Sequence, residues 1–157
     1  MNGTGRVKRP APFKGAGKAG FALAPHTADI IVKASASGYR PLFRRAARGL
    51  LAVFGAKAAA GKTCEVRLNL QSPDLDALLG AWLNETAYLV SSGKIIPSKI
   101  NIEELCLNRD GAKLMASLRG IKPSGLSFRR EVKGVPLHGL AIKRGKNGLS
   151  VWFIADI

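Results

Sequence analysis

Two aspartates are the residues whose type and position best suit metal binding. One lies near each end of the region that we predict to fold. Asp29 follows the segment His26–Ala28, and Asp156 directly precedes the α-carboxylate of Ile157. Carboxylates are scarce in this chain, which has 10 acidic residues against 25 lysines and arginines. If the first and last strands lie side by side, three oxygen donors converge, and oxygen donors suit a hard cation such as Ca²⁺, Mn²⁺ or Mg²⁺. The sequence therefore predicts a divalent-metal site at Asp29, Asp156 and Ile157.

Two histidines are candidates for acid–base chemistry. His26 comes three residues before Asp29, and His138 lies in Val135–Lys143, which we predict to be a strand with His138 on its apolar face. A single histidine on an apolar face is usually a hydrogen-bonded core residue, so a core role and a functional role both stay open for each. A metal-dependent hydrolase that uses His26, Asp29 and Asp156 is one function compatible with these residues.

The charge of the chain predicts a polyanionic or acidic partner. The formal net charge is +15, and the Gly- and Pro-rich stretch Met1–Lys18 has basic residues and no acids. We predict that this stretch is a flexible basic arm, followed by one domain over 19–157. Three arginines, Arg40, Arg44 and Arg48, line one side of a predicted helix. They could bind phosphates or an acidic partner, or they could form an ordinary solvated helix face.

Two glycine patterns resemble nucleotide-binding motifs but lack the required context. Gly15–Gly20 matches G-x-G-x-x-G, yet it follows a basic tail and precedes a strand, whereas a dinucleotide site follows a strand and opens a helix. Ala56–Thr63 resembles a relaxed phosphate-binding loop, but the order here is helix, loop, then strand, which places Lys62 and Thr63 in a loop. We therefore predict no nucleotide site in either segment.

Hydrophobic periodicity predicts an α+β fold with two amphipathic helices on a largely antiparallel sheet. The second helix has Ser72 as its expected cap and Pro73 at its first position, and we expect it to end at Ser91–Gly93. Cys64 and Cys106 fall in separate strands, which favours buried free thiols in a reducing cytosol. The last strand is apolar on both faces, so we expect it to be central and covered. The predicted elements are the helix Tyr39–Phe54 and the strands Phe21–Ala24, Asp29–Ala36, Cys64–Leu70, Ile100–Leu107, Lys113–Arg119, Val135–Lys143 and Leu149–Ile157.

Four short segments of the chain, in this order, resemble the signature segments of the archease family. The resemblance covers about Phe21 to Ile157 and leaves the basic arm outside it. Each segment alone is a weak signal, but four in register are specific. They are His26–Ile30, Ala81–Leu89, Val132–His138 and Ile154–Ile157.

This resemblance implies a cytoplasmic, non-catalytic accessory protein. Members of the family assist the RNA ligase RtcB, which uses GTP and a divalent metal to join RNA ends in tRNA splicing, so GTP would be bound by the partner. The resemblance also implies a metal site at the residues matching Asp29 and Asp156, with Ile157 contributing. It further implies that Lys133 contributes to the activity of the family. His26 and His138 lie within the matching segments and are candidates for contact with the partner.

The chain departs from the family pattern in ways that keep a second function open. The stretch Gly120–Gly125, which is acidic in typical members, contains Lys122 and no acid here. Leu137 replaces a common tyrosine, and Ile31 replaces a common glycine. Because the charge is strongly basic, the alternative is an RNA-binding or chaperone-like module on the same fold, with direct RNA contact through the arm and the Arg40 helix face. No apolar run reaches the length of about 18 residues that a membrane-spanning helix needs.

Overall fold

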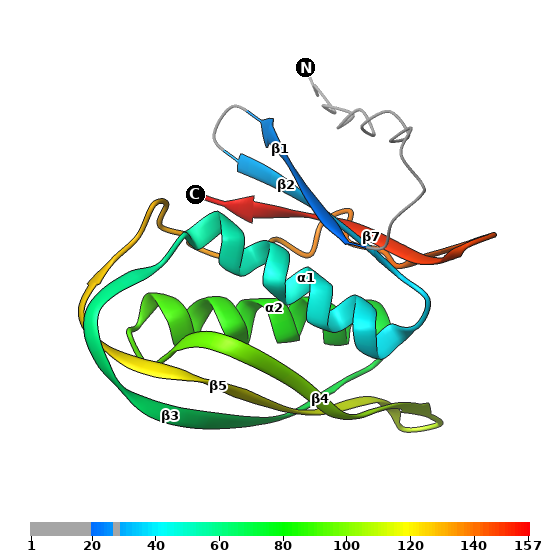
Figure 1. The fold of residues 1–157 in the computed structure, drawn as a ribbon. Helices are drawn as coiled ribbons and strands as arrows, with labels where there is room; N and C mark the ends of the chain where they lie inside the picture. The colour runs from blue at the N-terminus through cyan, green and yellow to red at the C-terminus, as the bar shows by residue number, and fades with distance from the viewer. Residues whose placement is uncertain (1–19, 27–28) are drawn as a thin grey trace, which may run out of the picture.

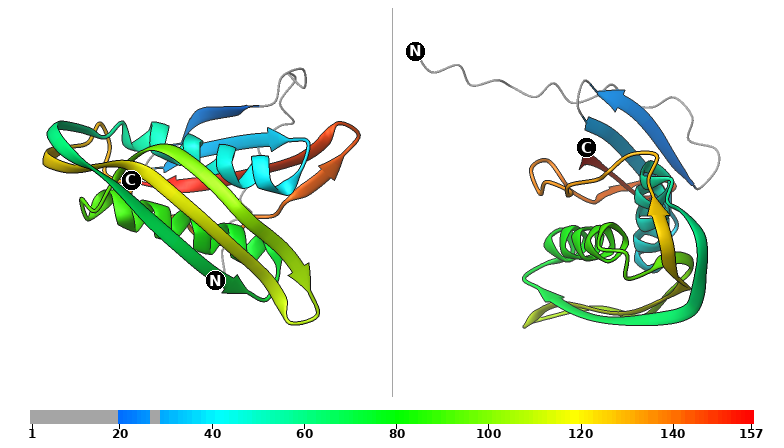
Figure 2. Two further views of the ribbon diagram at one scale, coloured as in Figure 1. Left: turned by 60° about the horizontal axis from the view of Figure 1, so that its bottom comes forward. Right: turned by 90° about the vertical axis from the view of Figure 1, so that its left-hand side faces the viewer.

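A computed structural model describes residues 20–26 and 29–157, with side chains described outside 24–26. The predicted basic arm, Met1–Lys18, lies outside the described residues, and so do most of the Gly15–Gly20 pattern and Thr27. Two helices lie between two antiparallel β-sheets, as Figure 1 and the right-hand view of Figure 2 show. The predicted α+β class with two helices on antiparallel sheet is therefore confirmed.

The two sheets divide the strands unequally. The first sheet has the order β1-β2-β7-β6, and the second has the order β3-β5-β4, with every pair antiparallel. Helix α1 packs mainly against the first sheet and α2 against the second. The elements are β1 (Phe21–His26), β2 (Asp29–Ala36), α1 (Tyr39–Phe54), β3 (Lys57–Ser72), α2 (Leu75–Ser91), β4 (Ile96–Asn108), β5 (Gly111–Ser127), β6 (Lys143–Gly145) and β7 (Gly148–Asp156).

Strand alternation gives the first sheet its buried face. Alternate residues of β2 and β7 pair across the sheet and are buried against the helices, as in Val32 opposite Phe153 and Ala34 opposite Val151. Strand β7 lies between β2 and β6, so the prediction of a central last strand is confirmed. Its second face is half-buried rather than fully covered, because alternate residues of β7 remain partly exposed.

The helices follow the apolar patterns of the sequence. Helix α1 spans the predicted residues and ends at Gly55, whose φ of 50° is the left-handed conformation that glycine adopts readily. Buried Trp82 of α2 donates its indole N–H to the carbonyl oxygen of Phe43 over 3.0 Å, which ties the two helices together. The predicted cap at Ser72 is wrong. Asp74 caps α2 and accepts from the Ala77 amide over 2.8 Å, because Ser72 still pairs within β3.

Two further predictions of local structure are wrong. Val135–Lys143 is not a strand: it is irregular with a turn at His138 and Gly139, and only Lys143 joins the short β6. Its apolar residues are accounted for by packing along α2 rather than by strand pairing. Lys62 and Thr63 are not loop residues, since β3 starts at Lys57 and pairs with β5 along its length.

The cysteines are free but only half-buried. Cys64 lies in β3 and Cys106 in β4, on the second sheet. The expectation of buried thiols is therefore wrong in its degree: Cys64 packs against the core from the edge strand β3, and Cys106 lies opposite Lys113 of β5. Arg109 and Asp110 form the turn between β4 and β5, which the pair Asn108–Gly111 closes, and the Asp110 amide donates to Oδ1 of Asn108 over 2.8 Å.

A close contact between α1 and β2 makes a test of the packing. An added Cβ at Gly49 would lie 2.5 Å from Cγ1 of Val32. Gly49→Ala should therefore lower the free energy of unfolding by about 1–3 kcal/mol through overpacking, although alanine in an open helix is favoured by about 1 kcal/mol. Urea denaturation measures this change. Combined with Val32→Ala, which makes room for the added methyl group, Gly49→Ala should destabilise the protein less than the sum of the two single variants predicts. A Gly49→Ala variant more stable than the wild type would contradict the packing.

Candidate functional site

The residues predicted to bind metal meet at the end of the first sheet. Asp29 of β2 lies directly opposite Asp156 of β7 in the antiparallel register. On the other side of β7, Asp156 pairs with Gly134 through an isolated bridge. On the other side of β2, the backbone of His26 lies opposite Asp29. His26, Asp29, Asp156 and Gly134 thus form one row across the sheet.

The two carboxylates lie on the sheet face that points away from the helices. Their neighbours in sequence, Ile30 and Ala155, pair with each other on the buried face, so alternation turns Asp29 and Asp156 outward. Both aspartates are half-exposed. Directly opposite residues in an antiparallel pair have Cβ atoms about 4.5–5.5 Å apart, and like charges there destabilise the sheet.

Basic side chains do not neutralise this pair within the part of the chain that the structure describes. The ion pairs recorded there both involve Glu65 of β3, on the other sheet. The pair therefore combines oxygen donors, partial exposure and mutual repulsion, a donor set that matches the preference of a hard divalent cation. No group of three His, Cys, Asp or Glu side chains gathers at one point among the described residues. A cation here would need further oxygen ligands, such as the predicted terminal carboxylate of Ile157 or water.

Lys133 is held next to Asp156 by main-chain bonds. The Lys133 amide donates to the carbonyl oxygen of Asp156 over 2.7 Å, and the Asp156 amide donates to the Gly134 carbonyl oxygen over 2.9 Å. The Lys133 side chain is exposed. The exposed Lys133 side chain thus starts from a backbone position beside Asp156, although the sequence separates Lys133 from Asp29 by about a hundred residues.

Asn84 of α2 fixes the segment that carries Lys133. Its Nδ2 donates to the Val135 carbonyl oxygen over 2.8 Å, and its Oδ1 accepts from the Val135 amide over 2.9 Å. The same Nδ2 also donates to the Gly80 carbonyl oxygen over 3.0 Å, which anchors the side chain to its own helix. Sequence reasoning did not single out Asn84. The available signal was a polar amide within a strongly apolar helix, where a buried donor and acceptor need partners.

A second clamp holds the rest of this loop along α2. Asp76 accepts from the Ile142 amide over 2.9 Å, near the helix N-terminus. Leu137 lies over Gly80, where an added Cβ would collide with its side chain. Asp76 lies in the first turn of α2, so its side chain joins the start of the helix to the end of the loop.

The remaining predicted site residues do not join the carboxylate row. His138 is exposed in a turn that the Leu140 amide closes on the Leu137 carbonyl oxygen over 3.2 Å. The predicted apolar strand face for His138 is therefore wrong. On α1, Arg40 and Arg48 are exposed, whereas Arg44 is half-buried and its buried Nε has no hydrogen-bond partner among the described residues. The arginine stripe is thus less uniform than its spacing suggests.

The arrangement defines an α+β protein with two helices between antiparallel sheets and paired carboxylates at one sheet end. The model of the Archease protein family matches residues 21–157. The chain therefore belongs to the archease family. The family match begins at the first residue of β1 and leaves the basic arm outside it.

Curated relatives and a solved structure agree with this assignment. The chain is 29% identical to the archease of Archaeoglobus fulgidus over 132 residues, which covers 84% of this chain and 95% of the relative. It is 30% identical to an archease of Saccharolobus islandicus over 140 residues, covering 87% of this chain and 98% of the relative. The solution structure of protein 1598 of Methanobacterium thermoautotrophicum superposes with a TM-score of 0.74 at 26% identity, covering 88% of this chain and 99% of that one.

Neither helix of the described chain has the length and hydrophobicity to cross a membrane.

The Asn84 clamp predicts a local loss of order when it is removed. Asn84→Ala leaves the Val135 amide and carbonyl without their side-chain partners, so we expect the free energy of unfolding to fall by about 1–3 kcal/mol. Amide hydrogen exchange at Lys133 and Asp156 should accelerate more than exchange in β3. Asn101→Ala, at an exposed position of β4, is the matched control. Unchanged exchange at Lys133 and Asp156 in Asn84→Ala would contradict the clamp.

Proposed function

We propose that the chain is a non-catalytic activator of an RtcB-type RNA ligase and that it acts through a divalent-metal site at Asp29 and Asp156. Membership of the archease family supports the class of function. The observation that carries the proposal is the register of β2 and β7, which sets two half-exposed carboxylates opposite each other in an otherwise basic chain. The ligase would hold GTP and carry out the covalent chemistry.

The metal part of the proposal follows from electrostatics. Two carboxylates at directly opposing positions repel each other, and a divalent cation between them converts that repulsion into attraction. Ca²⁺, Mn²⁺ and Mg²⁺ all prefer such oxygen ligands, with Ile157 proposed to supply a further oxygen. In this account the two aspartates at the end of the first sheet supply part of the ligand set. Water or oxygen atoms of the partner supply the remaining ligands when a cation binds.

Lys133 gives the same sheet end an affinity for phosphate. Its ammonium is a compact point charge, and ammonium groups of this kind bind phosphate oxygens in many nucleotide and RNA sites. Because the main-chain bonds to Asp156 and the Asn84 clamp fix the backbone of this segment, Lys133 would stay beside the carboxylates when the ligase docks. His26 and His138 remain proposed contributors to the partner contact.

Metal binding has a direct test in the isolated protein. Mn²⁺ should raise the unfolding temperature of the wild type, with a stabilisation of about 2.7 kcal/mol at a hundred times the dissociation constant. Asp29→Asn should lose this response. Without metal the same variant should unfold at an equal or higher temperature than wild type, since one repelling charge is gone. Asp110→Asn, which removes an exposed turn carboxylate, is the control. An equal Mn²⁺ response in Asp29→Asn and wild type would contradict the site.

Activation has its own test with the cognate ligase. A substoichiometric amount of wild-type protein should accelerate ligase guanylylation by labelled GTP in the presence of Mn²⁺. Asp156→Asn and Lys133→Ala should each reduce this acceleration by about tenfold or more, equivalent to about 1.4 kcal/mol per factor of ten. Asp110→Asn should activate like wild type. Failure of the wild type to stimulate would overturn the activator function and favour the RNA-binding alternative.

A further inference from the structure

The second sheet has one face that no helix covers. Its inner face packs on the helices through residues such as Leu114 and Leu118. Its outer face is the lower surface in Figure 1 and is open along β3, β5 and β4 within the described part of the chain. We call this surface the outer sheet face and define it by two adjacent rows of paired residues. The rows are Glu65, Arg119 and Lys99, and Arg67, Ser117 and Asn101; Ser117 is buried, and the other five residues are exposed.

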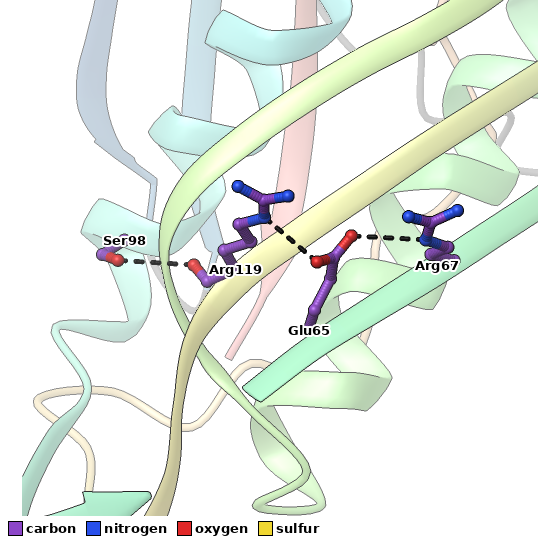
Figure 3. A network of polar contacts seen from close by, with 4 residues as sticks. All are labelled: Glu65, Arg67, Ser98 and Arg119. Atoms are coloured by element: carbon purple, nitrogen blue, oxygen red, sulfur yellow. Dashed lines mark hydrogen bonds and ion pairs between the residues drawn. The ribbon is translucent and has the colours of Figure 1, made fainter. Parts of the chain in front are cut away.

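A single carboxylate orients two arginines on this face. Glu65 accepts from the Nε of Arg67 over 3.3 Å and from the Nε of Arg119 over 3.0 Å, one on each oxygen (Figure 3). The Arg119 backbone is tied in turn to β4, because Ser98 donates to its carbonyl oxygen over 3.3 Å. Each guanidinium thus uses its Nε for Glu65 and keeps its terminal Nη atoms free of other described residues.

These terminal nitrogens are accessible to a ligand. The side chains of Arg67 and Arg119 are 75% and 59% exposed, whereas that of Glu65 is 30% exposed. Lys99 is also exposed and lies in the same row as Arg119. The face therefore presents three cations around one partly covered carboxylate.

Glu65 stays charged in this setting. Desolvation would by itself raise the pKa of Glu65, but the hydrogen bonds and charges of Arg119 and Arg67 outweigh it and lower the pKa. The carboxylate therefore keeps orienting both arginines throughout the neutral range. Its single negative charge leaves a surplus of positive charge on the two rows.

The chemistry of the face favours phosphates over an acidic protein. Guanidinium groups with free Nη edges match the geometry of phosphate oxygens. Protein interfaces are built around apolar or aromatic anchors, and the large exposed apolar side chains of the described chain lie elsewhere. The two rows contain no aromatic residue on which a base could stack, so contact would be with the backbone and independent of sequence.

We propose that the outer sheet face binds the phosphodiester backbone of RNA, with Arg67, Arg119 and Lys99 as the contacting cations. The surface is separate from the carboxylate row, which lies on the other sheet. The choice of RNA over DNA rests on the proposed function. The location of the binding surface rests only on the residues of the outer sheet face. Binding at the outer sheet face would keep the activator on the RNA whose ends the ligase joins.

The test measures RNA binding in the absence of ligase and metal. Full-length protein is titrated into a labelled, unstructured 20-nucleotide RNA in EDTA, and the anisotropy is followed from 50 to 300 mM salt. The variant Arg67→Gln/Arg119→Gln should weaken binding about tenfold and should reduce the slope of log affinity against log salt by about 1.4, or 0.7 for each cation. The matched control, Arg40→Gln/Arg48→Gln on α1, removes the same charge and should keep the wild-type slope.

Further variants separate loss of contact from loss of folding. Lys99→Gln lies outside the Glu65 network and should reduce the slope by about 0.7. Arg67→Lys/Arg119→Lys keeps both charges and should retain most of the affinity. A loss confined to the α1 control, or an equal loss in both double variants, would overturn the outer sheet face as the binding surface.

Competitors distinguish the kind of ligand. Polyglutamate at the same charge concentration should displace the RNA poorly, and effective displacement would assign the face to an acidic protein. Tenfold tighter binding to a DNA strand of equal length would overturn the assignment to RNA. Because the assay contains neither ligase nor metal, its failure leaves the activator test unaffected, and failure of activation leaves this test unaffected.

Discussion

The register between β2 and β7 is the constraint on which the candidate site depends. Side chains alternate between the two faces of a strand, so a slip of one residue would move the paired aspartates toward the helices and the apolar residues toward solvent. Large apolar pairs such as Val32 and Phe153 prevent that slip, because burying charge in their place would be very costly. The hydrophobic core therefore fixes the positions of Asp29 and Asp156, even though neither belongs to the core.

The second structural requirement is the attachment of the Lys133 segment to this sheet end. The segment has only an isolated bridge to β7, so its pairing alone is weak. Asn84 of α2 replaces the hydrogen bonds that a strand partner would make, because its side chain bonds both the amide and the carbonyl oxygen of Val135. A helix that packs on the second sheet thus positions a residue at the edge of the first. This coupling makes the site sensitive to the packing between the two layers.

Much of the fold could be predicted from the sequence, for identifiable reasons. The period of apolar residues predicted α1 with the bounds that the structure shows. The sequence also suggested that Asp29 and Asp156 would meet if their strands were neighbours, which is a statement about topology that the strand order of the first sheet fulfils.

Other features depend on tertiary contacts that no local pattern encodes. His138 was expected on a strand because its neighbours alternate in polarity, but those apolar residues pack along α2 instead. The Asn84 bonds span 51 residues, and the Arg119 bond to Glu65 spans 54. The length of β3 was also underestimated, since Lys57–Thr63 has few strand-forming residues and owes its extension to pairing with β5.

The measurement that tests the central claim most directly is paramagnetic broadening of the amide NMR spectrum by Mn²⁺. At substoichiometric Mn²⁺, the account predicts that signals of Ile30, Lys133, Gly134 and Ile157 broaden first, since they adjoin the carboxylate row. The same titration of Asp29→Asn should leave these signals sharp. Broadening that begins at the exposed acidic turn around Asp110, with the sheet end unaffected, would contradict a metal site at Asp29 and Asp156.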